Sequence, residues 1–134
     1  MASIPDSRTL ATLLAAGRLA IGVAASVAPE LGARSWVGEH GRGPAGKVLG
    51  RALGARDLAL AVGALTSMGE REQFWRWIRL GAFADAGDAL ATVLNWRSLP
   101  KTSRIGVLGV AAGAAVLGAV LGQGQEREEA QTLR

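Results

Sequence analysis

Residues 105–122 read IGVLGVAAGAAVLGAVLG, an apolar run without a charged or polar side chain. A helix of about 20 apolar residues is long enough to cross the hydrocarbon core of a membrane. A helix on the surface of a soluble protein needs a polar face toward water, and this run has none. The run therefore predicts a membrane-spanning helix.

Three further apolar stretches precede it, at residues 7–28, 48–68 and 74–96, and polar, Gly- and Pro-containing connections separate them. Pro29 and Pro100 mark two of the expected helix ends, and a polar tail, QGQEREEAQTLR, occupies residues 123–134. We expect an all-α fold, an integral membrane bundle of four transmembrane helices in one domain. Its expected location is the plasma (inner) membrane, as a multi-pass protein.

Two other interpretations of these runs stay open. A soluble four-helix bundle rich in alanine would have helices of similar length. The first run also resembles a secretory signal, although Asp6 precedes it and Arg18 interrupts its centre.

The composition excludes several classes of site. The chain has no cysteine and one histidine, so neither a disulfide framework nor a Cys- or His-based metal site is expected, and no cofactor is expected. The net charge of +4 could suit nucleic acid, but the basic residues are scattered between apolar runs and form no continuous stripe. We therefore expect no nucleic-acid partner.

Charged residues near the middle of the predicted spans carry the most information. Arg18, Asp57, Asp85 and Asp88 would each cost several kcal/mol if they faced lipid, so they should face protein. Helical spacing places each of them on a stripe of small or polar residues. We expect a buried ion-pair cluster with no net charge, formed by Arg18, Arg51, Arg56, Asp57, Asp85 and Asp88.

Glycine and tryptophan patterns add expectations about contacts. Glycines four residues apart let helix backbones approach closely, which predicts helix contacts at Gly50, Gly54, Gly109, Gly113 and Gly118. The tryptophans lie near the predicted helix ends, where such rings anchor a protein at the membrane interface: Trp36, Trp75, Trp77 and Trp96. Lys and Arg are equally common in the two sets of connections, so orientation stays undecided.

Catalytic chemistry has little support in the sequence. His40 lies in a Gly-rich connection with no serine or acid at a diagnostic spacing, and no nucleophile, base and orienting group can be assembled. We therefore expect no enzyme. Asp85 and Asp88 could handle a proton or cation, but arginines are available to neutralise both, so a structural ion-pair network is preferred.

The strings GRALGARDLALAVGAL (residues 50–65) and GAFADAGDALATVL (residues 81–94) resemble small four-span membrane proteins of actinobacteria that have no established function. The resemblance implies the four-helix fold. Together with the size of the chain, it suggests an accessory subunit of a larger membrane assembly, most specifically a lipid transporter of the mammalian-cell-entry type. The expected partners are membrane lipid and another protein. The alternative is a small self-assembling proton- or ion-coupled transporter that uses the intramembrane carboxylates.

Overall fold

A computed structural model describes the backbone of residues 6–132 and the side chains of residues 6–122. Within these limits the fold is all-α, with no strand. Four long helices dominate, and one short helix follows the first. The elements in chain order are α1 (Ser7–Val27), α2 (Pro29–Val37), η1 (Gly38–Gly41), α3 (Gly43–Thr66), α4 (Arg71–Leu94), η2 (Trp96–Ser98) and α5 (Lys101–Thr132).

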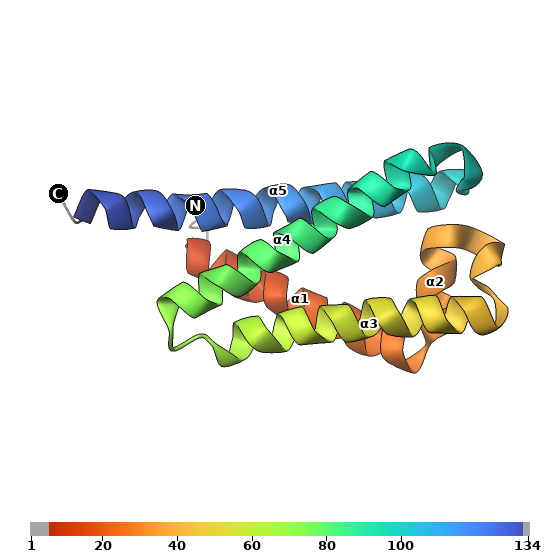
Figure 1. Cartoon of the computed structure of the whole chain (residues 1–134), viewed down its shortest axis with the longest axis horizontal. Coiled ribbons are helices and arrows are strands. Elements are labelled where there is room, and N and C mark those ends of the chain that lie inside the picture. Colours follow the sequence, from red (N-terminus) through yellow and green to blue (C-terminus); the bar gives the residue numbers. More distant parts are fainter. Residues whose placement is uncertain (1–5, 133–134) are drawn as a thin grey trace, which may run out of the picture.

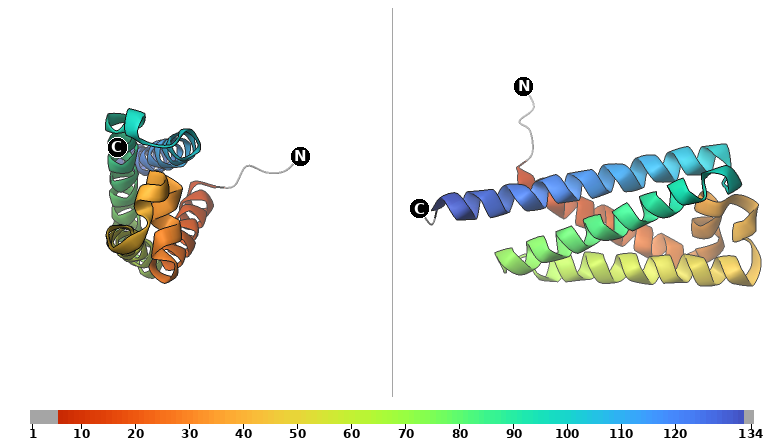
Figure 2. Two further views of the ribbon diagram at one scale, coloured as in Figure 1. Left: turned by 90° about the vertical axis from the view of Figure 1, so that its right-hand side faces the viewer. Right: turned by 45° about the horizontal axis from the view of Figure 1, so that its top comes forward.

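The long helices form two packed pairs, α1 with α3 and α4 with α5 (Figure 1). A tight turn joins α3 to α4, and α4 runs obliquely from the first pair to the second. The short helix α2 covers the end of the bundle opposite this turn and packs on α3. The C-terminal part of α5 projects past the other helices (Figure 2).

The first helix boundary follows ordinary capping chemistry. The side chain of Asp6 accepts a hydrogen bond from the backbone N–H of Thr9 at 2.7 Å, which satisfies a free donor at the start of α1. The same bond holds the pKa of Asp6 below its ordinary value, because it favours the ionised carboxylate.

The connection at residues 30–47 differs from the expected polar loop. Pro29 ends α1 as predicted but also begins α2, where a missing N–H is harmless because the first turn has no partner for it. Ala33 is buried against the bundle, so α2 has an apolar side. After it, Arg42 and then Arg34 lower the pKa of Glu39 by hydrogen bonding to its carboxylate.

Glycines set the close approach of α1 to α3. A Cβ atom on Gly22 would lie 2.8 Å from the backbone nitrogen of Leu58, and one on Gly54 would lie 2.9 Å from the carbonyl oxygen of Gly22. A Cβ on Gly50 would overlap the carbonyl group of Pro29. The predicted contacts at Gly50 and Gly54 are thus backbone-to-backbone contacts.

The glycines of α5 divide into two groups. A Cβ on Gly118 would lie 2.9 Å from the Cβ of Ala82, so Gly118 lets α5 pack against α4. Gly109 and Gly113 have nothing within 4 Å of that position, and both are exposed. The expectation of a helix contact at these two residues is therefore wrong within the described chain, because they lie on the outer face of α5.

Large side chains gather near the α3–α4 turn. Phe74 and Trp75 are 1% and 4% exposed, and their rings meet edge to face with centroids 5.1 Å apart. They pack with Ala11, Ala15 and other core residues. The prediction that Trp75 is an interface anchor is wrong, because its ring lies in this core.

The other three tryptophans are half-buried. The ring of Trp77 lies where a Cβ on Gly63 would be, so α4 packs tightly on α3 there. The guanidinium of Arg104 lies over the ring of Trp96, 4.9 Å from its centroid. Nε1 of Trp36 donates a hydrogen bond to the hydroxyl of Thr92. Each ring keeps an exposed part near a helix end.

Among the residues that the structure describes, two segments are long and apolar enough to cross a membrane, α1 and residues 101–122 of α5. In each, 22% of the residues of the most apolar stretch are buried, so most of these apolar residues are not enclosed by the other helices. The other two long helices, α3 and α4, are long enough but too rich in charge to qualify as spans. The apolar part of each carries three charged residues, Arg51, Arg56 and Asp57 in α3 and Arg79, Asp85 and Asp88 in α4.

A pair of alanine substitutions on α1 tests the glycine contact. Gly22→Ala should destabilise the fold by about 1–3 kcal/mol, because its methyl group meets the α3 backbone. Gly17→Ala, in open space on the same helix, should instead stabilise it by about 0.5–1 kcal/mol through helix propensity. Thermal unfolding in detergent, followed by circular dichroism, measures both. Equal shifts for the two variants would contradict the packing described here.

Candidate functional site: a buried ion-pair network beside an apolar cavity

The network lies where three helices turn their small-residue stripes toward one another. On α1, Arg18 follows the buried Ala11 and Ala15 at helical spacing. On α3, Asp57 continues the buried row of Gly50 and Gly54. Small neighbours leave room for long side chains, so an arginine from one helix reaches carboxylates on two others.

Arg18 is the centre of the network. Its Nη1 donates to Oδ1 of Asp57 at 3.1 Å, and its Nη2 pairs with Oδ2 of Asp85. Nη2 also lies 3.4 Å from the carbonyl oxygen of Gly81, on the α4 stripe. The three charged side chains are each about 10% exposed. One guanidinium thus links α1, α3 and α4 in the interior.

Arg56 makes a second, more open set of bonds. Its Nη1 and Nη2 donate to the two oxygens of Asp88 at 2.7 and 2.8 Å, a bidentate pair that fixes the relative orientation of α3 and α4. Nη2 also donates to Oδ1 of Asp57 at 3.0 Å. The side chains of Arg56 and Asp88 are 31% and 19% exposed, so this pair lies at the edge of the network.

A neutral chain of hydrogen bonds continues the network to α2. The hydroxyl of Thr92 donates to the carbonyl oxygen of Asp88 at 2.8 Å, and Nε1 of Trp36 donates to that hydroxyl at 3.0 Å. Thr92 lies one helical turn after Asp88, but its partner Trp36 cannot be predicted from the sequence, because the segment that forms α2 resembles a loop. This bond makes Trp36 an internal link between α2 and α4.

Arg51 does not join the other five residues, which corrects the predicted cluster. Its side chain is exposed, because it is six positions from Asp57 and therefore points to another side of α3. The network that remains has two guanidinium groups and three carboxylates. With all of them ionised it carries one net negative charge, so the expected neutral sum is wrong.

A cavity of about 430 Å³ borders the network. Its walls are apolar side chains and glycines from α1, α2, α3 and α5, including Ile21, Leu31, Leu53 and Val107. Arg56, Asp57 and Asp88 are the charged residues of its lining. Such a cavity can hold an apolar group and still offer an ionic contact to one end of it.

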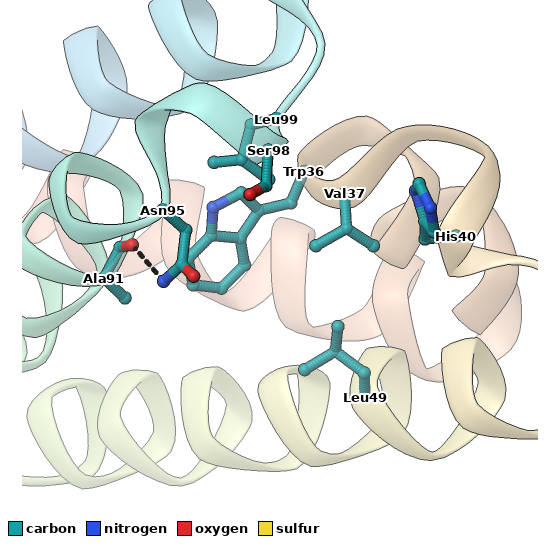
Figure 3. Close-up of a pocket in the computed structure, with 8 residues that line it drawn as sticks. All are labelled: Trp36, Val37, His40, Leu49, Ala91, Asn95, Ser98 and Leu99. Carbon is teal, nitrogen blue, oxygen red and sulfur yellow. Dashed lines mark hydrogen bonds between the residues drawn. The ribbon is translucent and has the colours of Figure 1, made fainter.

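A second cavity, of about 330 Å³, lies on the other side of Trp36 and includes His40, Asn95 and Ser98 (Figure 3). In the view of Figure 3, His40 lies at one end of the cavity, and Val37 lies between it and Ser98. The amide of Asn95 donates to the carbonyl of Ala91 on its own helix at 2.9 Å. These side chains do not assemble a base and a nucleophile.

In the described part of the chain, no three Asp, Glu, His or Cys side chains lie together in a way that could hold a metal ion. The acidic side chains of the network instead take guanidinium partners. What the arrangement can do is neutralise charge within an apolar interior and present a single excess carboxylate to the adjacent cavity.

Comparison with known proteins adds no relative: no family model matches the chain, and no curated protein or solved structure matches it.

Removing Arg18 should be far more damaging than removing Arg51. Arg18→Met leaves Asp57 and Asp85 without their shared cation, and breaking a buried pair in this way costs about 3–5 kcal/mol. Arg51→Met, at an exposed position on the neighbouring helix, should change stability by less than about 0.5 kcal/mol. Denaturant unfolding in detergent measures both.

Adding Asp85→Asn to Arg18→Met should restore part of the lost stability, because one uncompensated carboxylate disappears. A double variant less stable than Arg18→Met alone would contradict direct coupling between the two side chains.

Proposed function

We propose that the protein is a non-enzymatic membrane subunit that crosses the bilayer four times and docks on a larger membrane assembly through the outer face of α5. The observation that supports this most directly is the set of glycines on that face that no part of the described chain uses.

The surface of the bundle suits lipid. Large apolar side chains are exposed on every long helix, including Val27 at 81% and Phe83 at 80%. Soluble monomers rarely expose apolar surface on this scale. In a bilayer these side chains would lie in hydrocarbon, and the four helices would need no other cover.

Ion pairing is what makes α3 and α4 plausible spans despite their charges. Asp57, Asp85 and Asp88 all have arginine partners within the bundle, so they do not face hydrocarbon as bare charges. Arg51 lies nearer the start of α3 and can extend toward the headgroups.

The outer face of α5 has a helix-docking pattern. Gly106, Gly109 and Gly113 are exposed, have nothing within 4 Å of a Cβ position and share one side of the helix at steps of three and four residues. Each glycine in a helix interior costs about 0.5–1 kcal/mol relative to alanine. A contact with a helix of another protein would offset that cost, since it lets the backbones approach closely.

The resemblance to small actinobacterial four-span proteins names a partner to test first, a lipid importer of the mammalian-cell-entry type. The α5 face itself specifies only a transmembrane helix with a matching surface of small residues.

Purification of the native protein in mild detergent tests the docking role. We expect it to co-purify in fixed stoichiometry with a larger membrane complex, and Gly109→Leu with Gly113→Leu should abolish this, because bulk at the contact separates the helices. Gly87→Leu, an exposed glycine of α4 with the same open surroundings, is the matched control. Recovery of the native protein only as a monomer, as shown by native mass spectrometry, would refute the docking role.

A self-assembling proton-coupled transporter is the second candidate, and the excess carboxylate of the network favours it. Protein reconstituted into vesicles with a pH-sensitive dye distinguishes the two. A docking subunit should give the same proton flux as protein-free vesicles. Flux that appears with the parent protein and is lost in Asp85→Asn would instead favour the transporter.

A further inference from the structure

The lining of the cavity beside the ion-pair network has an apolar part and a charged part. Ile21, Val27 and Leu31 belong to the apolar part and are 55%, 81% and 67% exposed, so the cavity opens through apolar side chains. The charged part, or inner end, consists of Arg56, Asp57 and Asp88, whose side chains are 31%, 11% and 19% exposed. A molecule that fits must therefore have an apolar body and a polar or charged head.

The charges at the inner end determine the sign of that head. One guanidinium and two carboxylates line the cavity, which leaves one net negative charge when all three are ionised. The rest of the network, Arg18 and Asp85, does not line the cavity and adds no net charge, so the five residues together keep one excess negative charge although Arg18 also bonds to Asp57. A net charge in apolar surroundings is costly, and a cation placed next to it offsets that cost.

The carboxylates can still accept a further partner. Both oxygens of Asp88 are bonded to Arg56, but this side chain is 19% exposed, so a cationic head can still approach it and interact with its charge. An ammonium group at the inner end would contact Asp88 and Asp57 without displacing the arginines.

We propose that this cavity binds one amphiphilic organic cation, with its positive head at Asp57 and Asp88 and its hydrocarbon chain along α1 and α2. The volume of about 430 Å³ is in the range of cavities that hold small ligands. This inference does not depend on the docking role of α5, since the cavity and the outer α5 glycines involve different residues.

Calorimetric titration of the full chain in lipid nanodiscs tests the proposal, with empty nanodiscs subtracted. Octyltrimethylammonium should bind saturably with one site per chain. Octanol and octanoate, which have the same chain length and a neutral or negative head, should bind at least tenfold more weakly. Equal binding of all three, or partitioning without saturation, would overturn the proposal.

Two variants locate the site. Asp88→Asn removes the excess negative charge and should weaken binding of octyltrimethylammonium at least tenfold, whereas Glu72→Gln, an exposed carboxylate of the same helix, should leave it unchanged. Ala24→Phe fills the cavity from an exposed position of α1 and should abolish binding while the ion pairs stay in place. Unchanged binding in Ala24→Phe would show that the cation binds elsewhere. Unchanged binding in a folded Asp88→Asn protein would overturn the charge argument.

Discussion

Arg18 brings a positive charge into the middle of the bundle, and the position of three helices depends on where that charge is neutralised. Asp57 of α3 and Asp85 of α4 meet it from two sides, each at about 10% exposure. In surroundings of low polarity a guanidinium that lacks carboxylate partners is costly, so both acids turn toward Arg18. The network therefore specifies which faces of α1, α3 and α4 turn inward, while large apolar side chains outside it remain exposed.

Close backbone contact is the second requirement, because a guanidinium reaches two other helices only where those helices lie near. Gly22 and Gly54 bring α1 against α3, and Gly118 brings α5 against α4. The glycines of α5 serve two different surfaces, since Gly118 faces the bundle and Gly109 and Gly113 face away from it. Internal packing uses the first of these surfaces and leaves the second open.

Helical periodicity and the cost of isolated charge were enough to predict much of this from the sequence. They placed Arg18, Asp57 and Asp85 on facing stripes, and the structure joins them directly. They failed for Arg51 because its position was judged by depth along the helix and not by its angle around it. They failed for Gly109 and Gly113 because a glycine spacing marks a surface suited to a helix without saying whether that helix belongs to the same chain.

Helix α2 and its bond from Trp36 to Thr92 could not be predicted, because a short polar-looking segment between two proline residues resembles a loop in sequence. Its apolar side becomes evident only when Ala33 is placed against the bundle. The sequence also could not show where Trp75 packs, because its position near a helix end is typical of an interface anchor. Tertiary packing with Phe74 decided its place in the core.

The central claim is that α4 crosses the membrane with its two aspartates paired inside the bundle, and the side of the membrane on which each end of α4 lies can be measured directly. The chain has no cysteine, so single cysteines at Gly69, before α4, and at Ser98, after it, can be labelled with a membrane-impermeant maleimide in sealed vesicles. The account predicts that the two positions lie on opposite sides, so that only one is labelled until the vesicles are opened. Labelling of both in sealed vesicles, or release of the protein into buffer without detergent, would contradict it.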